Sequence, residues 1–175
     1  MAARWKPPLA DASVGRPYVL CAFDDLEAYQ GIRKDLESRF GKIDFETENI
    51  SGDTLQSQYG ALPRRMVRVL SFGRPAAREE LVDIRRRCLA VESKHQSHGR
   101  PLVELDPGYV VEFAVVHTAL AEDFHRIYLY GGVFAETLYY FERLSFRPQI
   151  HTAQFYRQKE LLGVFNDLRL IHLAD

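Results

Sequence analysis

The segment HRIYLYGGVFAE, residues 125–136, carries a histidine near one end and a glutamate near the other of a largely apolar stretch. Two short strands joined by the two central glycines would pair Ile127 with Glu136. Side chains alternate along strands, so His125 and Glu136 would then be diagonal neighbours on one face. A carboxylate beside an imidazole in a dry setting fixes the histidine tautomer and increases its basicity, as a general base requires. The alternative is that the two groups only satisfy each other inside the core.

A second chemical motif is LDPGY, residues 105–109. Its Asp-Pro-Gly composition is typical of a type II turn. Alternatively, Asp106 ends a strand and faces His125 and Glu136, and such a carboxylate and histidine cluster could hold a divalent cation. Two further histidines could join it: His117 and His151. Single histidines on apolar stretches are usually core or surface residues, so we assign no metal ligand and leave the cofactor open.

Arginine is concentrated between Arg64 and Arg100. Interleaved acids favour a solvated face, with Arg85 and Arg86 turned away from the apolar stripe of their helix. The alternative is a groove for phosphate or carboxylate groups, which arginine binds better than lysine does. The aromatic and basic residues of an RNA-binding sheet are present, but in no recognisable motif order, which argues against nucleic acid.

The elements that must position these residues follow from periodicity and caps. Apolar spacing predicts strands at 17–23, 42–50, 64–72 and 100–105, and helices at 24–41 and 76–96. Asp24 or Asp25 would cap the first helix and Gly41 would end it. This order is βαββαβ, the ferredoxin-like pattern. The rest of the chain adds a β-hairpin and a final helix within 155–173. We therefore predict an α+β fold with its helices on one face of a mainly antiparallel sheet.

Composition limits the classes of protein. The 175 residues suit one domain, which we place at 17–175 after a loose leader at 1–16. A net charge of −1 argues against a surface that is broadly basic or acidic. Cys21 and Cys88 have no metal-ligand or disulfide spacing and suit buried thiols. No signal peptide and no stretch of roughly 20 apolar residues is visible, so a cytoplasmic location away from membranes is expected.

The motifs LDPGY (105–109), HRIYL (125–129), GGVFAE (131–136) and RFGKIDFE (39–46) together carry a family resemblance. The chain resembles a divergent member of a bacterial family catalogued as domain of unknown function 4416, from about Tyr18 to the final helix. The resemblance implies one domain in a bacterial cytoplasm and no particular activity. Four positions depart from the family pattern: Glu104, Ala114, Ala121 and Phe155. An activity that needed the basic or acidic residues of that pattern is in doubt here.

We expect a small-molecule-binding or enzymatic domain for an anionic or phosphorylated ligand. Its pocket would join catalytic Asp106, His125 and Glu136 to substrate-binding residues: Tyr109, Arg126, Tyr156 and Arg157. In an enzyme, His125 would be the acid or base, Glu136 its orienting partner, and Arg126 or Arg157 the anion clamp.

A different class stays open, a non-catalytic domain that forms a homodimer or docks a protein through the aromatic hairpin. RNA binding by the sheet is a weaker third hypothesis. The sequence lacks a phosphate loop, a dinucleotide fingerprint, a nucleophile elbow and the HExxH motif. Whether the domain is an enzyme is left undecided.

Overall fold

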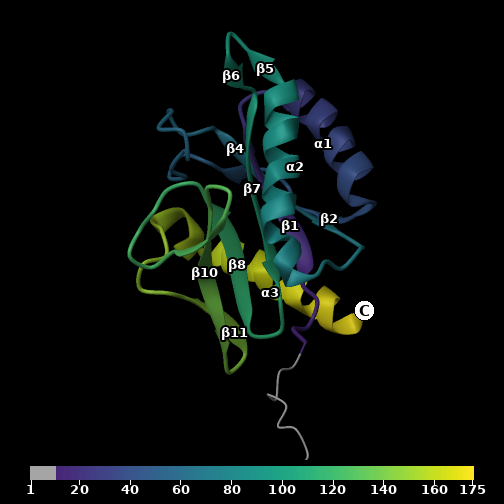
Figure 1. Ribbon diagram of the computed structural model, residues 1–175, viewed down its shortest axis with the longest axis vertical. Coiled ribbons are helices and arrows are strands. Elements are labelled where there is room, and N and C mark those ends of the chain that lie inside the picture. Colours follow the sequence, from purple (N-terminus) through teal and green to yellow (C-terminus); the bar gives the residue numbers. More distant parts are fainter. Residues whose placement is uncertain (1–10) are drawn as a thin grey trace, which may run out of the picture.

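Three helices pack around one large antiparallel sheet in the computed structural model, which describes residues 11–175 (Figure 1). The sheet has the order β11-β10-β8-β7-β1-β4-β2. Its strands are β1 (Arg16–Phe23), β2 (Ile43–Glu46), β4 (Met66–Phe72), β7 (Val103–Val110), β8 (Ala114–Ala119), β10 (Val133–Glu142) and β11 (Ser145–Pro148). Short strands β3 (Ile50–Ser51) and β9 (Ile127–Tyr130) pair with β4 and β10, while β5 (Gln96–Ser97) and β6 (Arg100–Pro101) pair with each other. The prediction of an α+β fold with a mainly antiparallel sheet is confirmed.

The helices are α1 (Leu26–Phe40), α2 (Leu81–Lys94) and α3 (Lys159–Ala174), and the 3-10 turns η1 (Arg78–Glu80) and η2 (Gln154–Arg157) precede α2 and α3. Asp25 caps α1 by accepting hydrogen bonds from two backbone N–H groups of its first turn. Gly41 follows the last turn at φ 94°, a conformation that favours glycine. No helix in residues 11–175 is long and apolar enough to cross a membrane.

The predicted leader at 1–16 falls mostly outside the described residues, which begin at position 11. Gly15 already forms a β-bridge with Ala76, and Arg16 opens β1. The Arg16 side chain is buried and lies 2.5 Å from the carboxylate of Asp44. Within the described residues, strand pairing therefore starts just before the predicted boundary at residue 17.

Helices cover both faces of the central strands (Figure 1). Alternate residues of β1 belong to different cores: Val19 and Cys21 pack with α1 and α2, whereas Tyr18 and Leu20 pack with α3. The prediction that the helices share one face therefore does not hold for α3. The physical reason is that every residue of β1 is buried, so the strand is apolar on both faces and needs cover on each.

The LDPGY motif is strand and not turn, which corrects our default interpretation of it. All five residues lie inside β7, paired with β1. The carbonyl of Pro107 accepts a hydrogen bond from the Thr118 hydroxyl, so the carbonyl and the nitrogen of Pro107 both point toward β8. Pairing between β7 and β8 begins only at Gly108. Proline is tolerated because no ladder hydrogen bond is needed there.

The Gly131-Gly132 hairpin forms with the predicted two-residue turn but a different register. Both glycines have positive φ, 61° and 80°, and Tyr130 pairs with Val133. A bulge between Val133 and Phe134 then pairs Ile127 with Ala135, not with Glu136 as predicted. One extra residue in β9, Leu129, is enough to move the partner by one position.

A seam between β7 and β8 divides the sheet, because these strands share only three residue pairs, from Gly108–His117 to Val110–Val115. Before Gly108, β8 does not pair with β7, and side chains of α2 bond to the β7 backbone at Leu105 instead. The Leu105 N–H donates to Glu92 at 2.6 Å, and its carbonyl accepts from Arg85. Both side chains are buried, which corrects the prediction that Arg85 lies on a solvated face.

Candidate functional site

A lateral row of residues crosses four neighbouring strands on the α3 face of the sheet. The register aligns Tyr18 of β1 with Gly108 of β7, Gly108 with His117 of β8, and His117 with Glu136 of β10. A side chain at position 108 would clash with the Tyr18 ring, so the tyrosine covers the glycine. The sheet itself therefore fixes a histidine and a glutamate side by side, next to a buried phenol.

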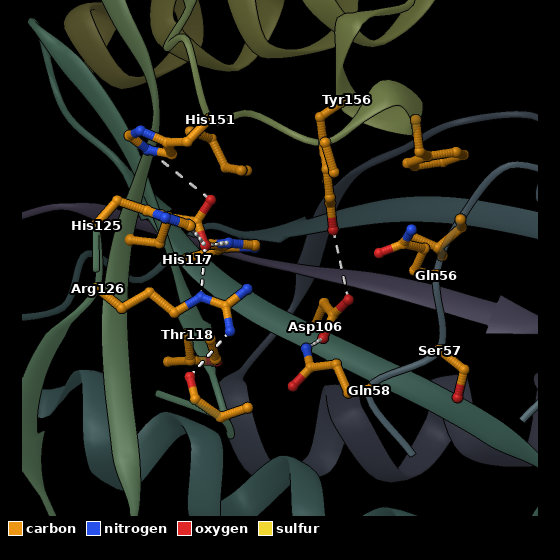
Figure 2. A pocket seen from close by; sticks show the side chains of 17 residues that line it. Gln56, Ser57, Gln58, Asp106, His117, Thr118, His125, Arg126, His151 and Tyr156 are labelled. Atoms are coloured by element: carbon orange, nitrogen blue, oxygen red, sulfur yellow. Dashed lines mark hydrogen bonds and ion pairs between the residues drawn. The ribbon is translucent and has the colours of Figure 1, made fainter. Parts of the chain in front are cut away.

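Glu136 is the centre of a polar cluster, and its partners His117, His125, Arg126 and His151 are labelled in Figure 2. Its Oε2 lies 2.9 Å from Arg126 Nε, 3.3 Å from His125 Nε2 and 3.4 Å from His117 Nε2. Its Oε1 faces His151, whose Nε2 is 4.0 Å away. His125 sits in the loop before β9, and it meets Glu136 although the predicted strand register is wrong.

The charge of Glu136 is set by these neighbours. Burial alone would raise the pKa of Glu136, because the glutamate is 5% exposed. The imidazole of His117 and the guanidinium of Arg126 outweigh burial and lower the pKa of Glu136 to about 2. The carboxylate is therefore ionised across the neutral range and available to a cation.

A second carboxylate, Asp106, lines the opposite side of the same cavity. It accepts hydrogen bonds from the Gln58 amide and, at 3.4 Å, from the Tyr156 hydroxyl. Arg85 Nη1 lies 3.5 Å from its Oδ1. Burial raises the pKa of Asp106, against the opposing effects of Arg85, His117 and Tyr156. The two carboxylates in one cavity thus have pKa values moved in opposite directions, a pattern that separates acid and base roles in many active sites.

Three consecutive loop residues close the cavity over Asp106, and each bonds to a buried carboxylate. Ser57 donates to Glu104 at 2.8 Å, Gln58 to Asp106 and Tyr59 to Glu92. Burial raises the pKa of Glu92 to about 7, although Tyr59, Arg85 and the Leu105 N–H oppose that rise. The loop is therefore anchored by acidic groups of β7 and α2.

The cavity has a volume of about 320 Å³, near the lower end of ligand pockets. Its polar walls come from the two carboxylate clusters and from Thr118. Its apolar walls include Leu55, Leu138 and Phe155. A small polar molecule of metabolite size would contact both carboxylates or their partners.

The structure brings together five of the seven residues predicted for the site. The residues that line the cavity are Asp106, His125, Arg126, Glu136 and Tyr156. Tyr109 does not line it, because side chains alternate along β7 and a step of three from Asp106 turns Tyr109 to the other face. Tyr109 packs instead against Gly15, with the Arg78 guanidinium 6.0 Å from its ring centre.

Arg157 also lies outside the cavity lining, and it has a different task from the predicted anion clamp. Its guanidinium donates to the backbone carbonyls of Gln149, Ile150 and Thr152 at 2.7–2.8 Å. These carbonyls flank His151. Arg157 therefore shapes the loop that brings His151 to the cavity.

Some residues of the cavity were not assigned to the site from the sequence. Gln58 and Thr118 carry no motif, and only the folded chain places them beside β7. His117 and His151 were predicted only as optional members of a cation cluster, and both line the cavity. His125, Glu136 and His151 offer ligand atoms that all lie within 4.8 Å of one another, a separation compatible with a metal site after small side-chain movements.

Comparison with known proteins gives one match. A family model described as "Domain of unknown function (DUF4416)" matches residues 16–172. No curated protein matches the chain, and no solved structure matches it.

Proposed function

We propose a function for this chain, which belongs to the DUF4416 family, a domain of unknown function whose description names no activity. The chain binds a small anionic molecule in its cavity, between the Glu136 and Asp106 clusters. The observation that carries this proposal is the convergence of three imidazoles, an arginine and several neutral donors on one cavity of about 320 Å³. A cavity with that many donors suits a ligand rich in acceptor oxygens.

Charge balance supports an anion. Each carboxylate of the cavity already has an arginine, Arg126 for Glu136 at 2.9 Å and Arg85 for Asp106 at 3.5 Å. The remaining polar groups are three imidazoles and the neutral side chains of Gln56, Ser57, Gln58, Thr118 and Tyr156. Arg126 uses Nε for Glu136 and Nη1 for the Ala121 carbonyl, and Nη2 has no hydrogen-bond partner in residues 11–175. Phosphate or carboxylate oxygens of a ligand would accept the remaining hydrogen bonds of Arg126.

If the bound molecule is a substrate, His125 is the group we assign as acid or base. Its Nε2 contacts Glu136, which would orient the ring and stabilise its protonated form. Its ring is only 10% exposed, so a ligand that enters the cavity would exclude most of the remaining water from it.

The test is binding of a panel of phosphorylated and carboxylated metabolites, followed by NMR of the histidine ring signals. We expect one class to shift the His125 signal saturably and to bind at least tenfold more weakly to a His125→Gln variant. His95→Gln is the matched control, since His95 also contacts a carboxylate, Asp35 at 2.7 Å, but outside the cavity. The proposal fails if no anion moves a cavity histidine, or if folded His125→Gln binds as the wild type does.

A second candidate function rests on the exposed strand β9. All four of its residues, Ile127–Tyr130, are exposed, and one of its edges has no strand partner in residues 11–175. An exposed apolar edge is a site at which another chain can add a strand. A homodimer or a protein partner at β9 would leave the cavity free. Tyr128→Lys would then reduce association in sedimentation experiments and leave anion binding unchanged.

We also propose that residues 16–110 form a ferredoxin-like unit. The observation in support is the order β7-β1-β4-β2, in which the first strand of the βαββαβ series, β1, lies between the last strand, β7, and the third strand, β4. A cytoplasmic location in a bacterium remains part of the proposal, and fractionation of cells would test it.

A further inference from the structure

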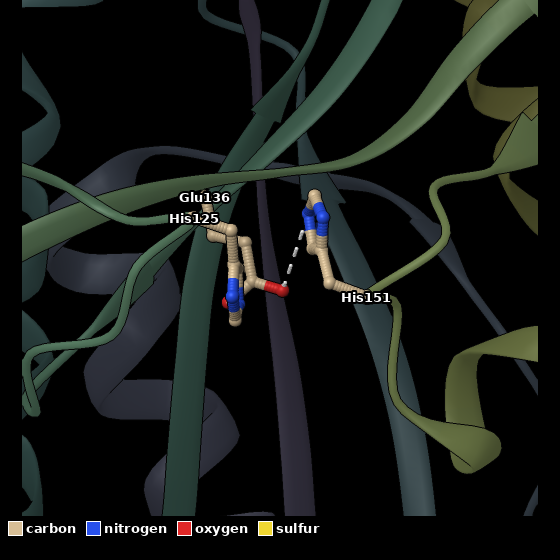
Figure 3. A group of neighbouring side chains, drawn as sticks. All are labelled: His125, Glu136 and His151. Atoms are coloured by element: carbon tan, nitrogen blue, oxygen red, sulfur yellow. Dashed lines mark ion pairs between the residues drawn. The ribbon is translucent and has the colours of Figure 1, made fainter.

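We propose that Glu136, His125 and His151 bind one divalent transition-metal ion. The three side chains come from different parts of the chain and meet at the cavity wall (Figure 3). Their ligand atoms lie within 4.8 Å of one another. The inference concerns the cavity of the proposed function, but it goes beyond the anionic ligand because the metal can be measured alone.

The distances fit a small ion. Two ligands bound at about 2.0–2.1 Å in tetrahedral geometry lie about 3.4 Å apart. His125 Nε2 and Glu136 Oε2 are already 3.3 Å apart, whereas His151 Nε2 is 4.0 Å from Oε1. For a metal on Oε1, His151 must move by less than about 1 Å, and the His125 ring must turn from Oε2 toward Oε1.

The two histidine rings must tilt to direct their lone pairs at one ion, because they now stack with centres 4.1 Å apart and planes 21° from parallel. His151 must also leave the Thr137 carbonyl, 3.3 Å from its Nε2. His125 and His151 lie in loops, and only Glu136 lies in a strand. The strand would hold the carboxylate while the loops adjust.

The Glu136 carboxylate is arranged so that one oxygen can bind a metal while the other keeps its hydrogen bond to Arg126. Arg126 holds Oε2 at 2.9 Å, while Oε1 points toward His151. A metal on Oε1 would leave the arginine hydrogen bond intact, and such outer partners orient ligating carboxylates in known metal sites. Arg126 and the ion therefore need not compete for the same oxygen.

Unpartnered ring nitrogens are the second observation that points to a ligand. His125 Nδ1 and His117 Nδ1 are buried and have no hydrogen-bond partner in residues 11–175, and Asp123 Oδ1, 3.7 Å from His125 Nδ1, is too far for a hydrogen bond. His117 is only 8% exposed and stands beside the same carboxylate. Buried polar atoms are normally satisfied, so atoms left without a protein partner indicate a group that the cavity takes up.

The donor set decides the class of metal. Two imidazoles and one carboxylate suit Zn²⁺, Fe²⁺, Ni²⁺ or Cu²⁺, whereas Mg²⁺ and Ca²⁺ prefer oxygen ligands alone. The two cysteines are buried in the core formed with α1 and α2 and supply no thiolate here. Three protein ligands leave coordination positions open to the cavity, where an anion could bind the metal directly.

The test is titration of metal-free protein with Zn²⁺ by calorimetry and with Co²⁺ by visible absorption. We expect one ion per chain, a Co²⁺ spectrum with nitrogen and oxygen ligands, and no comparable binding of Mg²⁺. His151→Gln and Glu136→Gln should each weaken Zn²⁺ binding at least tenfold. The control variant His95→Gln should bind Zn²⁺ as the wild type does.

The outcomes separate this inference from the proposed function. Undiminished Zn²⁺ binding by folded His151→Gln and Glu136→Gln overturns the assignment, as does the absence of Zn²⁺ binding by the wild type. His151→Gln keeps the test valid if Glu136→Gln does not fold, because His151 lies in a loop. Anion binding by metal-free protein would then support the proposed function without the metal site. Retained Zn²⁺ binding without anion binding would support the metal site without the proposed function.

Discussion

The phenol ring of Tyr18 occupies the space that a side chain at position 108 would fill. Gly108 is therefore required for close approach and not for a positive φ, since it lies in the middle of β7. The contact lets the Tyr18 ring lie over β7 in the row of paired residues that ends at Glu136.

Gly108→Ala should lower the free energy of unfolding by about 1–3 kcal/mol or more, because its new methyl group would meet Tyr18 and the Val116 carbonyl. Gly163→Ala is the control: this glycine is exposed in α3, and no neighbouring atom lies within 4 Å of the place that a methyl group would take, so alanine should stabilise by up to about 1 kcal/mol. Urea unfolding of both variants measures the difference. Equal effects would show that the approach at Gly108 is not tight.

Arg85→Met should lower the free energy of unfolding by about 3–5 kcal/mol, because it leaves Asp106 and the Leu105 carbonyl buried without their cation and donor. Urea unfolding again gives the value. Arg86→Met, an exposed neighbour on the same helix, serves as the control. A loss below about 1 kcal/mol for Arg85→Met would mean that water or Gln58 replaces the arginine.

Glu92 should make stability fall as pH rises. Burial raises its pKa from 4.5 to about 7, so the folded state holds a proton that the unfolded chain releases. The stabilisation is complete below about pH 4.5 and is lost as pH rises through about 7, by up to about 3 kcal/mol. Glu92→Gln should remove this loss, so its stability relative to wild type should increase between pH 5 and pH 8. Glu79→Gln, at an exposed site, should show no such change.

Arg157→Met should loosen the loop that carries His151, because three backbone carbonyls lose a charged donor. We expect the free energy of unfolding to fall by about 1.5–3 kcal/mol. Amide hydrogen exchange in residues 149–152 should accelerate, while exchange in β1 should change only as much as global stability does. Unchanged exchange in that loop would contradict the role we give to Arg157.

Sequence reasoning located the elements where local signals are strong. Asp25 and Gly41 mark the ends of α1 because caps act within one turn. The hairpin turn followed from two adjacent glycines, but its register did not, because a bulge in β9 leaves no local signature.

The errors at β7 and α2 share one cause. LDPGY has the composition of a turn, and Arg85 has the charge of a surface residue. Both assignments fail because of contacts far apart in the sequence: β7 pairs with β1 through the whole motif, and Arg85 bonds to β7 where β8 does not pair with it. The meeting of His125 with Glu136 was predicted on a wrong register, so it agrees in outcome and not in reasoning.

At the seam between β7 and β8, side chains near the cavity also take part in the hydrogen bonding of the sheet. Where the ladder stops, the side chains of Arg85, Glu92 and Thr118 take over hydrogen bonds that a strand would make. Asp106, on the same stretch of β7, faces the cavity. Redesign of this cavity for an apolar guest would therefore remove backbone partners along with polar walls. Replacements that keep each donor and acceptor in place are the ones open to an engineer.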